Sequence, residues 1–121
     1  MKATFYSLLA NGDPEGGLQP AATVPAEAFA TDDHAELIHA FYVSDESSVT
    51  SGVWECAPCT LPIESYPVNE MMSVISGSIT VTDSDGRSKT YGPGDSFFVA
   101  KGTNATFQIT EKLRKFFMTS V

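Results

Sequence analysis

Basic residues are scarce in this sequence, and their scarcity limits what the chain can bind. Seven Lys and Arg stand against fifteen Asp and Glu, which gives a formal net charge of −8 at pH 7. Nucleic acids and anionic membrane surfaces bind proteins through basic faces. The composition therefore argues against nucleic-acid and membrane partners, and the excess of acid is interpreted as a property that keeps the protein soluble.

Cysteines and long apolar runs are also rare. Two cysteines do not make the disulfide framework of a small secreted domain. No apolar run approaches the roughly 18 residues of a transmembrane helix. The short apolar piece near the N-terminus is interrupted at residues 11–13, before it reaches the length of a signal-peptide core. We therefore expect a cytoplasmic protein.

The residues that are present indicate a single all-β domain. Segments rich in β-branched and aromatic residues arrive about every 8 to 12 residues, and none shows a sustained helical period. This spacing is typical of a sandwich or barrel. Residues 25–30 offer one helical turn, with Pro25 at a first-turn position. Outside residues 77–102, the expected strands are residues 35–43, 49–56, 60–66, 70–76, 105–110 and 113–119.

Residues 77–102 form the most tightly punctuated stretch of the chain. Ile79 and Val81 alternate with polar residues, as in a half-buried strand. Turn-forming residues at 83–86 predict a hairpin. A second turn at residues 92–95 leads into another short strand.

Motifs at both ends of this stretch resemble those of the cupins. Glu70 and Gly77 have the spacing that ends the first cupin motif, and residues 93–95 (Pro-Gly-Asp) begin the second. With residues 52–56 and 66–70, they make the chain similar to small single-domain cupins akin to (S)-ureidoglycine aminohydrolase and the ethanolamine-utilisation cupin domains.

This resemblance implies a fold and an assembly. The fold is a double-stranded β-helix, the jelly-roll barrel of cupins. We expect one domain over residues 1–121, with an N-terminal arm and loop at 1–34 and the barrel at 35–121. The resemblance also implies a homodimer, in which residues 5–9 would be the exchanged segment.

The resemblance further implies a metal site, which this sequence alters. Counting back from Glu70, Glu64 and Tyr66 stand where cupins carry two histidines, and Ala105 replaces a third. Carboxylates and a phenol are weaker ligands for a transition metal than neutral imidazoles. We therefore expect no metal and no other cofactor.

The same positions predict a pocket in the barrel mouth. Strand alternation would place Glu64 and Tyr66 on one face, opposite Glu70, with Trp54 and Phe107 as apolar walls. Two neighbouring buried carboxylates should raise at least one pKa, and such a pair suits acid–base chemistry or an amine-bearing ligand. Alternatively, the polar groups bond one another and the aromatic residues belong to the core.

The leading functional hypothesis is a cupin that binds a small polar molecule, amine- or ureido-bearing. One alternative is a metal-independent, or atypically metal-dependent, hydrolase, lyase or isomerase, with one carboxylate as base and Tyr66 or the other carboxylate as acid. A second alternative is a non-catalytic regulatory or partner subunit. No catalytic residue is assigned.

The remaining reactive residues have plainer interpretations. Residues 56–59 (Cys-Ala-Pro-Cys) are interpreted as a strand end and loop. A redox dithiol normally lies at a helix N-terminus, and no helix is predicted here. The only histidines, His34 and His39, precede the motifs and read as packed or exposed; His39 is the first to examine should a metal exist. The basic residues at 112–115 are interpreted as a solvated strand edge.

Overall fold

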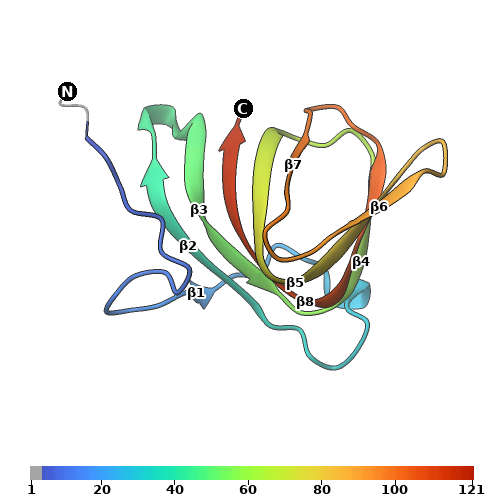
Figure 1. Cartoon of the computed structure of the whole chain (residues 1–121), viewed down its shortest axis with the longest axis horizontal. Coiled ribbons are helices and arrows are strands. Elements are labelled where there is room, and N and C mark those ends of the chain that lie inside the picture. Colours follow the sequence, from blue (N-terminus) through green and yellow to red (C-terminus); the bar gives the residue numbers. More distant parts are fainter. Residues whose placement is uncertain (1–3) are drawn as a thin grey trace.

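The computed structural model describes residues 4–121, which form an antiparallel β-barrel (Figure 1). Its elements are β1 (Gln19–Pro20), the 3-10 turn η1 (Ala26–Ala28), β2 (Glu36–Val43), the 3-10 turn η2 (Asp45–Ser47), β3 (Val49–Cys56), β4 (Cys59–Ile63), β5 (Asn69–Asp83), β6 (Ser88–Tyr91), β7 (Ser96–Val99) and β8 (Ala105–Ser120). The predicted all-β fold is confirmed, as is the helical turn predicted within residues 25–30.

Two long strands, β5 and β8, run through both layers of the barrel. Residues 69–76 pair with residues 114–120, and residues 78–83 pair with residues 105–111. The prediction that each strand was two separate strands is therefore wrong. Three register shifts between residues 74 and 79 bend the pair, because bulges kink a strand without ending it.

Gly77 makes this bend possible. Its φ is +81°, and a Cβ at this position would lie 1.9 Å from the carbonyl oxygen of Lys112. Only glycine takes this conformation and this approach without strain. The glycine that ends the first cupin motif is therefore the point where β5 crosses tightly over β8.

The bend divides the barrel into two facing layers. The first layer contains β1, β2, β3, the C-terminal half of β8, the N-terminal half of β5, and β7. The second contains β4, the N-terminal half of β8, the C-terminal half of β5, and β6. Figure 1 shows both layers curving around a common interior.

Alternating side chains from both layers fill much of that interior. The fully buried members include Cys56, Met72 and Leu113, and Phe107 joins them from the second layer. Fully burying an aliphatic side chain of this size contributes about 1.5–3 kcal/mol, so these contacts hold the layers together. Gly52 permits a close approach between β2 and β3, since a Cβ there would lie 2.3 Å from the carbonyl oxygen of His39.

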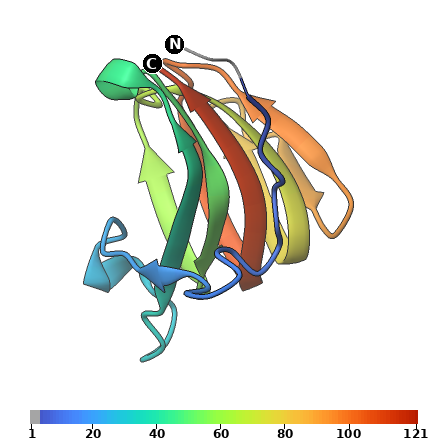
Figure 2. The ribbon, with the colours of Figure 1, turned by 90° about the vertical axis from the view of Figure 1, so that its left-hand side faces the viewer.

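The N-terminal arm runs along the outside of the first layer (Figure 2). Arg114 fastens it there by donating to the Ala10 carbonyl oxygen at 2.8 Å and to Asn11 Oδ1 at 3.0 Å. The same guanidinium pairs with Glu55 at 2.9 Å. Residues 5–9 form no strand and are exposed. No helix within residues 4–121 is long and apolar enough to cross a membrane.

A candidate ligand-binding cavity

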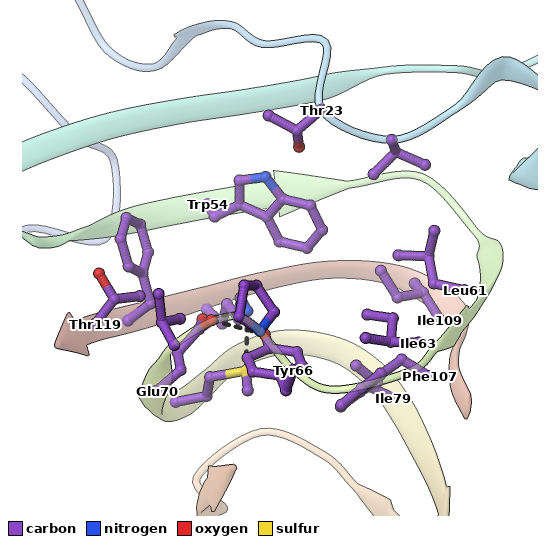
Figure 3. Close-up of a pocket in the computed structure, with 16 residues that line it drawn as sticks. Thr23, Trp54, Leu61, Ile63, Tyr66, Glu70, Ile79, Phe107, Ile109 and Thr119 are labelled. Atoms are coloured by element: carbon purple, nitrogen blue, oxygen red, sulfur yellow. Dashed lines mark hydrogen bonds and ion pairs between the residues drawn. The ribbon is translucent and has the colours of Figure 1, made fainter. Parts of the chain in front are cut away.

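A cavity of about 400 Å³ opens between the two layers (Figure 3). Its walls are mainly apolar and come from both layers, from the arm and from the loop between β4 and β5. The apolar wall of the second layer comprises Leu61, Ile63, Ile79, Phe107 and Ile109. Cavities of this size and character hold small organic ligands in many proteins.

Three polar side chains form a connected chain at one side of the cavity. Tyr66 donates its phenolic hydrogen to Glu70 Oε1 at 2.7 Å, and Lys115 Nζ donates to Glu70 Oε2 at 2.9 Å. Glu70 is only 7% exposed and Lys115 only 8%. An ion pair so far from water is weakly screened, and its strong local field is available to a bound molecule.

Strand register brings these groups together. Lys115 lies opposite Trp54 on β3 and opposite Val74 on β5, so all three side chains project into the interior. Glu70, four residues before Val74 on the same strand, projects into the same space. Tyr66 belongs to the preceding loop, where its backbone bonds residues 102 and 103.

Two further contacts hold the Lys115 ammonium. Its Nζ lies 2.9 Å from Met72 Sδ and 4.9 Å from the centre of the Trp54 ring. A thioether is a weak acceptor, whereas an aromatic face attracts a cation. The positive charge of Lys115 is therefore paired with the Glu70 carboxylate on one side and attracted by the face of the Trp54 ring on another.

The environment fixes the protonation state of Tyr66. Burial, together with the neighbouring Glu70 carboxylate and its hydrogen bond, raises the pKa of this phenol far above its ordinary value of 10.0. The hydroxyl therefore remains a neutral donor at physiological pH. It is unsuited to act as a base or as a phenolate ligand for a metal.

A second buried carboxylate, Glu36, positions the opposite wall. It accepts the Trp54 indole N–H at 2.9 Å and the backbone N–H groups of Thr23 at 2.9 Å and Val24 at 3.0 Å. The Thr23 hydroxyl bonds the same carboxylate. Desolvation opposes ionisation of Glu36, but these hydrogen bonds outweigh it and lower its pKa. Glu36 thereby holds both the arm and Trp54 against the cavity.

Of the residues expected to line a pocket, four do and one does not. Trp54, Tyr66, Glu70 and Phe107 line the cavity, and Phe107 is also part of the core. Glu64 is exposed and lies outside it. The placement of Glu64 and Tyr66 on one strand face is wrong, because β4 ends at Ile63 and Ser65 has a φ of +54°. Strand alternation does not continue through that turn.

Lys115 is the residue that sequence reasoning missed. The basic residues at 112–115 predict a solvated strand edge, whereas the structure buries Lys115 at the centre of the site. The signal was present in the alternation along β8, because Leu113, Lys115 and Phe117 share one face. The adjacent Phe116 and Phe117 obscured that period, since the barrel buries apolar residues on both faces of this strand.

The residues at the cupin metal positions do not suit a transition metal. Glu64 lies outside the cavity, Ala105 offers no donor, and the Tyr66 hydroxyl is bonded to Glu70. The Lys115 ammonium, 2.9 Å from Glu70, repels a second cation there. Residues 4–121 contain no cluster of three or more His, Cys, Asp or Glu side chains suited to a metal. The absence of a metal stays a prediction.

The histidines and cysteines lie apart from the polar chain. His39 pairs with Val53, on the face of the sheet opposite Trp54, and packs edge-on against Phe41 at 4.7 Å. The sulfur atoms of Cys56 and Cys59 are 3.9 Å apart and buried in the core. Their mutual hydrogen bond and burial raise the pKa of the Cys56 thiol, which keeps it unreactive.

Comparison with known proteins identifies the family. A family model described as the EutQ-like cupin domain matches residues 43–117. The chain belongs to this family. The resemblance inferred from Glu70, Gly77 and residues 93–95 is thereby confirmed. No curated protein matches the sequence.

Solved structures show the same fold. One is a DUF861-family protein of unknown function from Pseudomonas syringae pv. tomato, which is 23% identical to this cupin and superposes with a TM-score of 0.77. The match covers 90% of this chain but only 46% of that longer chain. The EutQ protein of Clostridium difficile is 19% identical, with a TM-score of 0.61 over 82% of this chain and 80% of its own. The polyketide cyclase RemF of Streptomyces resistomycificus is 16% identical, with a TM-score of 0.56 over 83% of this chain and 79% of its own. At these identities the likeness concerns the fold, which carries unrelated functions.

Proposed function

We propose that this cupin binds a small molecule with an apolar body and one polar group, held in the cavity between the two layers. The observation that supports it best is the connected chain of Tyr66, Glu70 and Lys115 within otherwise apolar walls. Such a chain orients the polar end of a ligand, while the walls select its size and shape.

The charges in the cavity favour a particular polar group. Two carboxylates with no cation would select an amine, as expected from the sequence. With Glu64 outside and Lys115 paired to Glu70, the polar chain inside the cavity instead carries no net charge. Lys115 still has a donor to offer, since its hydrogen bonds among residues 4–121 go only to Glu70 and Met72. A carbonyl oxygen, as in an aldehyde, ketone, amide or ureido group, fits this donor best.

A metal-independent lyase or isomerase remains a second candidate for one reason. The Tyr66 hydroxyl is a neutral donor, and it lies 2.7 Å from a carboxylate acceptor in a cavity with mainly apolar walls. A donor and an acceptor side by side are the minimum for moving a proton on a bound carbonyl compound.

The proposal is tested with four ligands that share one body. Butanal, butanamide, butylamine and butanoate present a carbonyl, an amide, a cation and an anion on the same short chain. Each is titrated into protein carrying ¹³C-labelled methionine methyls. Met72 lines the cavity, whereas Met71 and Met118 lie on the outer face of the sheet. Binding should shift the Met72 signal while leaving Met71 and Met118 in place.

Trp54 provides an independent readout, because it is the only tryptophan and it lines the cavity. We expect the carbonyl and amide ligands to change its fluorescence at lower concentration than the amine. Glu70→Gln should weaken that response, whereas Glu64→Gln serves as a matched control outside the cavity and should not. A panel that leaves both Met72 and Trp54 unchanged would contradict the proposal.

A further inference from the structure

Lys115 differs from the other lysines that the structure describes. Lys89, Lys101 and Lys112 are exposed, whereas Lys115 is 8% exposed and lines the cavity. Its amine faces a small apolar space in which a ligand carbonyl would be confined beside it. Lysine amines that are desolvated in apolar pockets form Schiff bases with carbonyl compounds in many enzymes.

We propose that Lys115 forms a reversible imine with a small aldehyde or ketone bound in this cavity. This imine site rests on the proposed function, because the carbonyl compound must first occupy the cavity. It assigns to Lys115 a covalent binding role and to the ligand a carbonyl carbon unhindered enough to be attacked.

Glu70 provides the proton relay that this step needs. Its Oε2 lies 2.9 Å from Nζ, so an ammonium proton can pass directly to the carboxylate. Tyr66 donates to the other carboxylate oxygen and keeps Glu70 turned toward the amine.

The step balances without an oxidant or a reductant. After the first proton moves to Glu70, the Nζ electron pair forms a bond to the carbonyl carbon. The carbonyl oxygen takes the second proton from nitrogen and becomes a hydroxyl group. Glu70 then returns its proton to that hydroxyl, the C–O bond breaks, and water leaves as the C=N bond forms.

The product retains the electrostatics of the free site. The iminium nitrogen carries the charge that the ammonium carried, and Glu70 is again a carboxylate beside it. The attraction to the Trp54 ring, whose centre is 4.9 Å from Nζ, persists for the same reason. The mainly apolar walls offer few partners to a water molecule beside the iminium, which slows hydrolysis back to the free amine.

The experiment traps the imine in the intact protein. Butanal is added with sodium cyanoborohydride, which reduces an iminium to a stable secondary amine, and the modified peptides are mapped by mass spectrometry. We expect a butyl group on Lys115 to appear at least about tenfold faster than on Lys89, Lys101 or Lys112, because confinement raises the local concentration of the aldehyde. Modification of Lys115 at or below the rate of these exposed lysines overturns the inference.

Two variants sharpen the result. Glu70→Gln keeps Lys115 but cannot take its proton, so butylation at Lys115 should slow while that of the exposed lysines is unchanged. Lys115→Arg preserves the cation and removes the nucleophile, so the cavity adduct should disappear. If either variant fails to fold, the relative butylation rates of the lysines in the unsubstituted protein still test the inference.

The failure of the imine is distinguishable from failure of the proposed function. A Met72 methyl shift with butanamide, together with no preferred butylation at Lys115, leaves the binding cavity and removes the imine. An absence of any Met72 shift across the four ligands removes both.

Discussion

Trp54 donates its indole N–H to Glu36, eighteen residues earlier in the chain, at 2.9 Å. The same carboxylate also accepts two backbone N–H groups from the arm, those of Thr23 and Val24. One side chain therefore holds a cavity wall and the segment that covers it. Substitution of Glu36 should therefore disturb the cavity wall at Trp54 without removing any member of the Tyr66–Glu70–Lys115 chain.

The first prediction concerns acid. The hydrogen bonds to Glu36 overcome its desolvation and lower its pKa below the ordinary value of 4.5, so the folded state favours the ionised form. The resulting stabilisation is fully present above pH 4.5 and is lost as the pH falls through the lowered pKa. Urea unfolding at a series of pH values should show this loss.

Glu36→Gln should remove this component of the acid dependence and lower the free energy of unfolding at pH 7 by about 1–3 kcal/mol, since charged hydrogen bonds are lost. Glu27→Gln, at an exposed position on η1, is the matched control. Equal pH profiles for the Glu36 variant and the unmodified protein would show that this network does not stabilise the fold.

The second prediction concerns the buried ion pair. Lys115→Met alone leaves the Glu70 charge without its partner, and should lower the free energy of unfolding by about 3–5 kcal/mol. Adding Glu70→Leu should recover much of the loss, because two apolar side chains replace the pair. The two single variants and the double variant are compared by urea unfolding. Additive losses would contradict a direct interaction between these residues.

The third prediction separates a backbone clash from backbone strain. Gly77 and Gly86 have similar φ values, +81° and +85°, but only Gly77 would bring a Cβ against backbone. Gly86→Ala should lose about 1–2 kcal/mol from the left-handed conformation alone. Gly77→Ala should lose clearly more, because the bend between the layers must shift. Thermal unfolding of both variants measures the difference, and equal losses would assign no role to the clash.

The fourth prediction is the homodimer implied by the cupin resemblance. Met71 is exposed on the outer face and pairs in the ladder with Phe98 and Met118, which are also exposed. A second copy packed on this apolar patch would cover it. Light scattering after size-exclusion chromatography should give a dimer mass, and Met71→Glu should give a monomer. Gln108→Glu, on the exposed face of β8, is the control. A monomer at every concentration would contradict the prediction.

The fifth prediction concerns metal. The Lys115 ammonium already neutralises Glu70, so elemental analysis of protein purified without added metal should show no stoichiometric transition metal. Titration with zinc or manganese should leave the Met72 methyl signal unchanged. An equimolar metal signal that disappears in Glu70→Gln would contradict the expectation.

Part of the candidate site could be predicted from the spacing of the cupin motifs. Glu70 and Gly77 fixed the register from which Tyr66 was counted, and Trp54 followed from its neighbouring strand. The same counting misplaced Glu64, because it assumed that β4 extends past Ile63. A single left-handed residue, Ser65, ends the alternation there. Nothing in the local residue pattern marks that conformation.

The sequence by itself determined the all-β fold, the cupin family and the loss of the metal-binding histidines. These follow from local patterns, since turn residues, strand alternation and motif spacing act over short stretches of chain. Only the tertiary structure decided the chemistry of the cavity. Lys115 and Glu70 are 45 residues apart and meet because β5 and β8 pair in the first layer, with both side chains on the interior face. A lysine with aromatic neighbours in sequence becomes a buried partner of a carboxylate only when the two layers close.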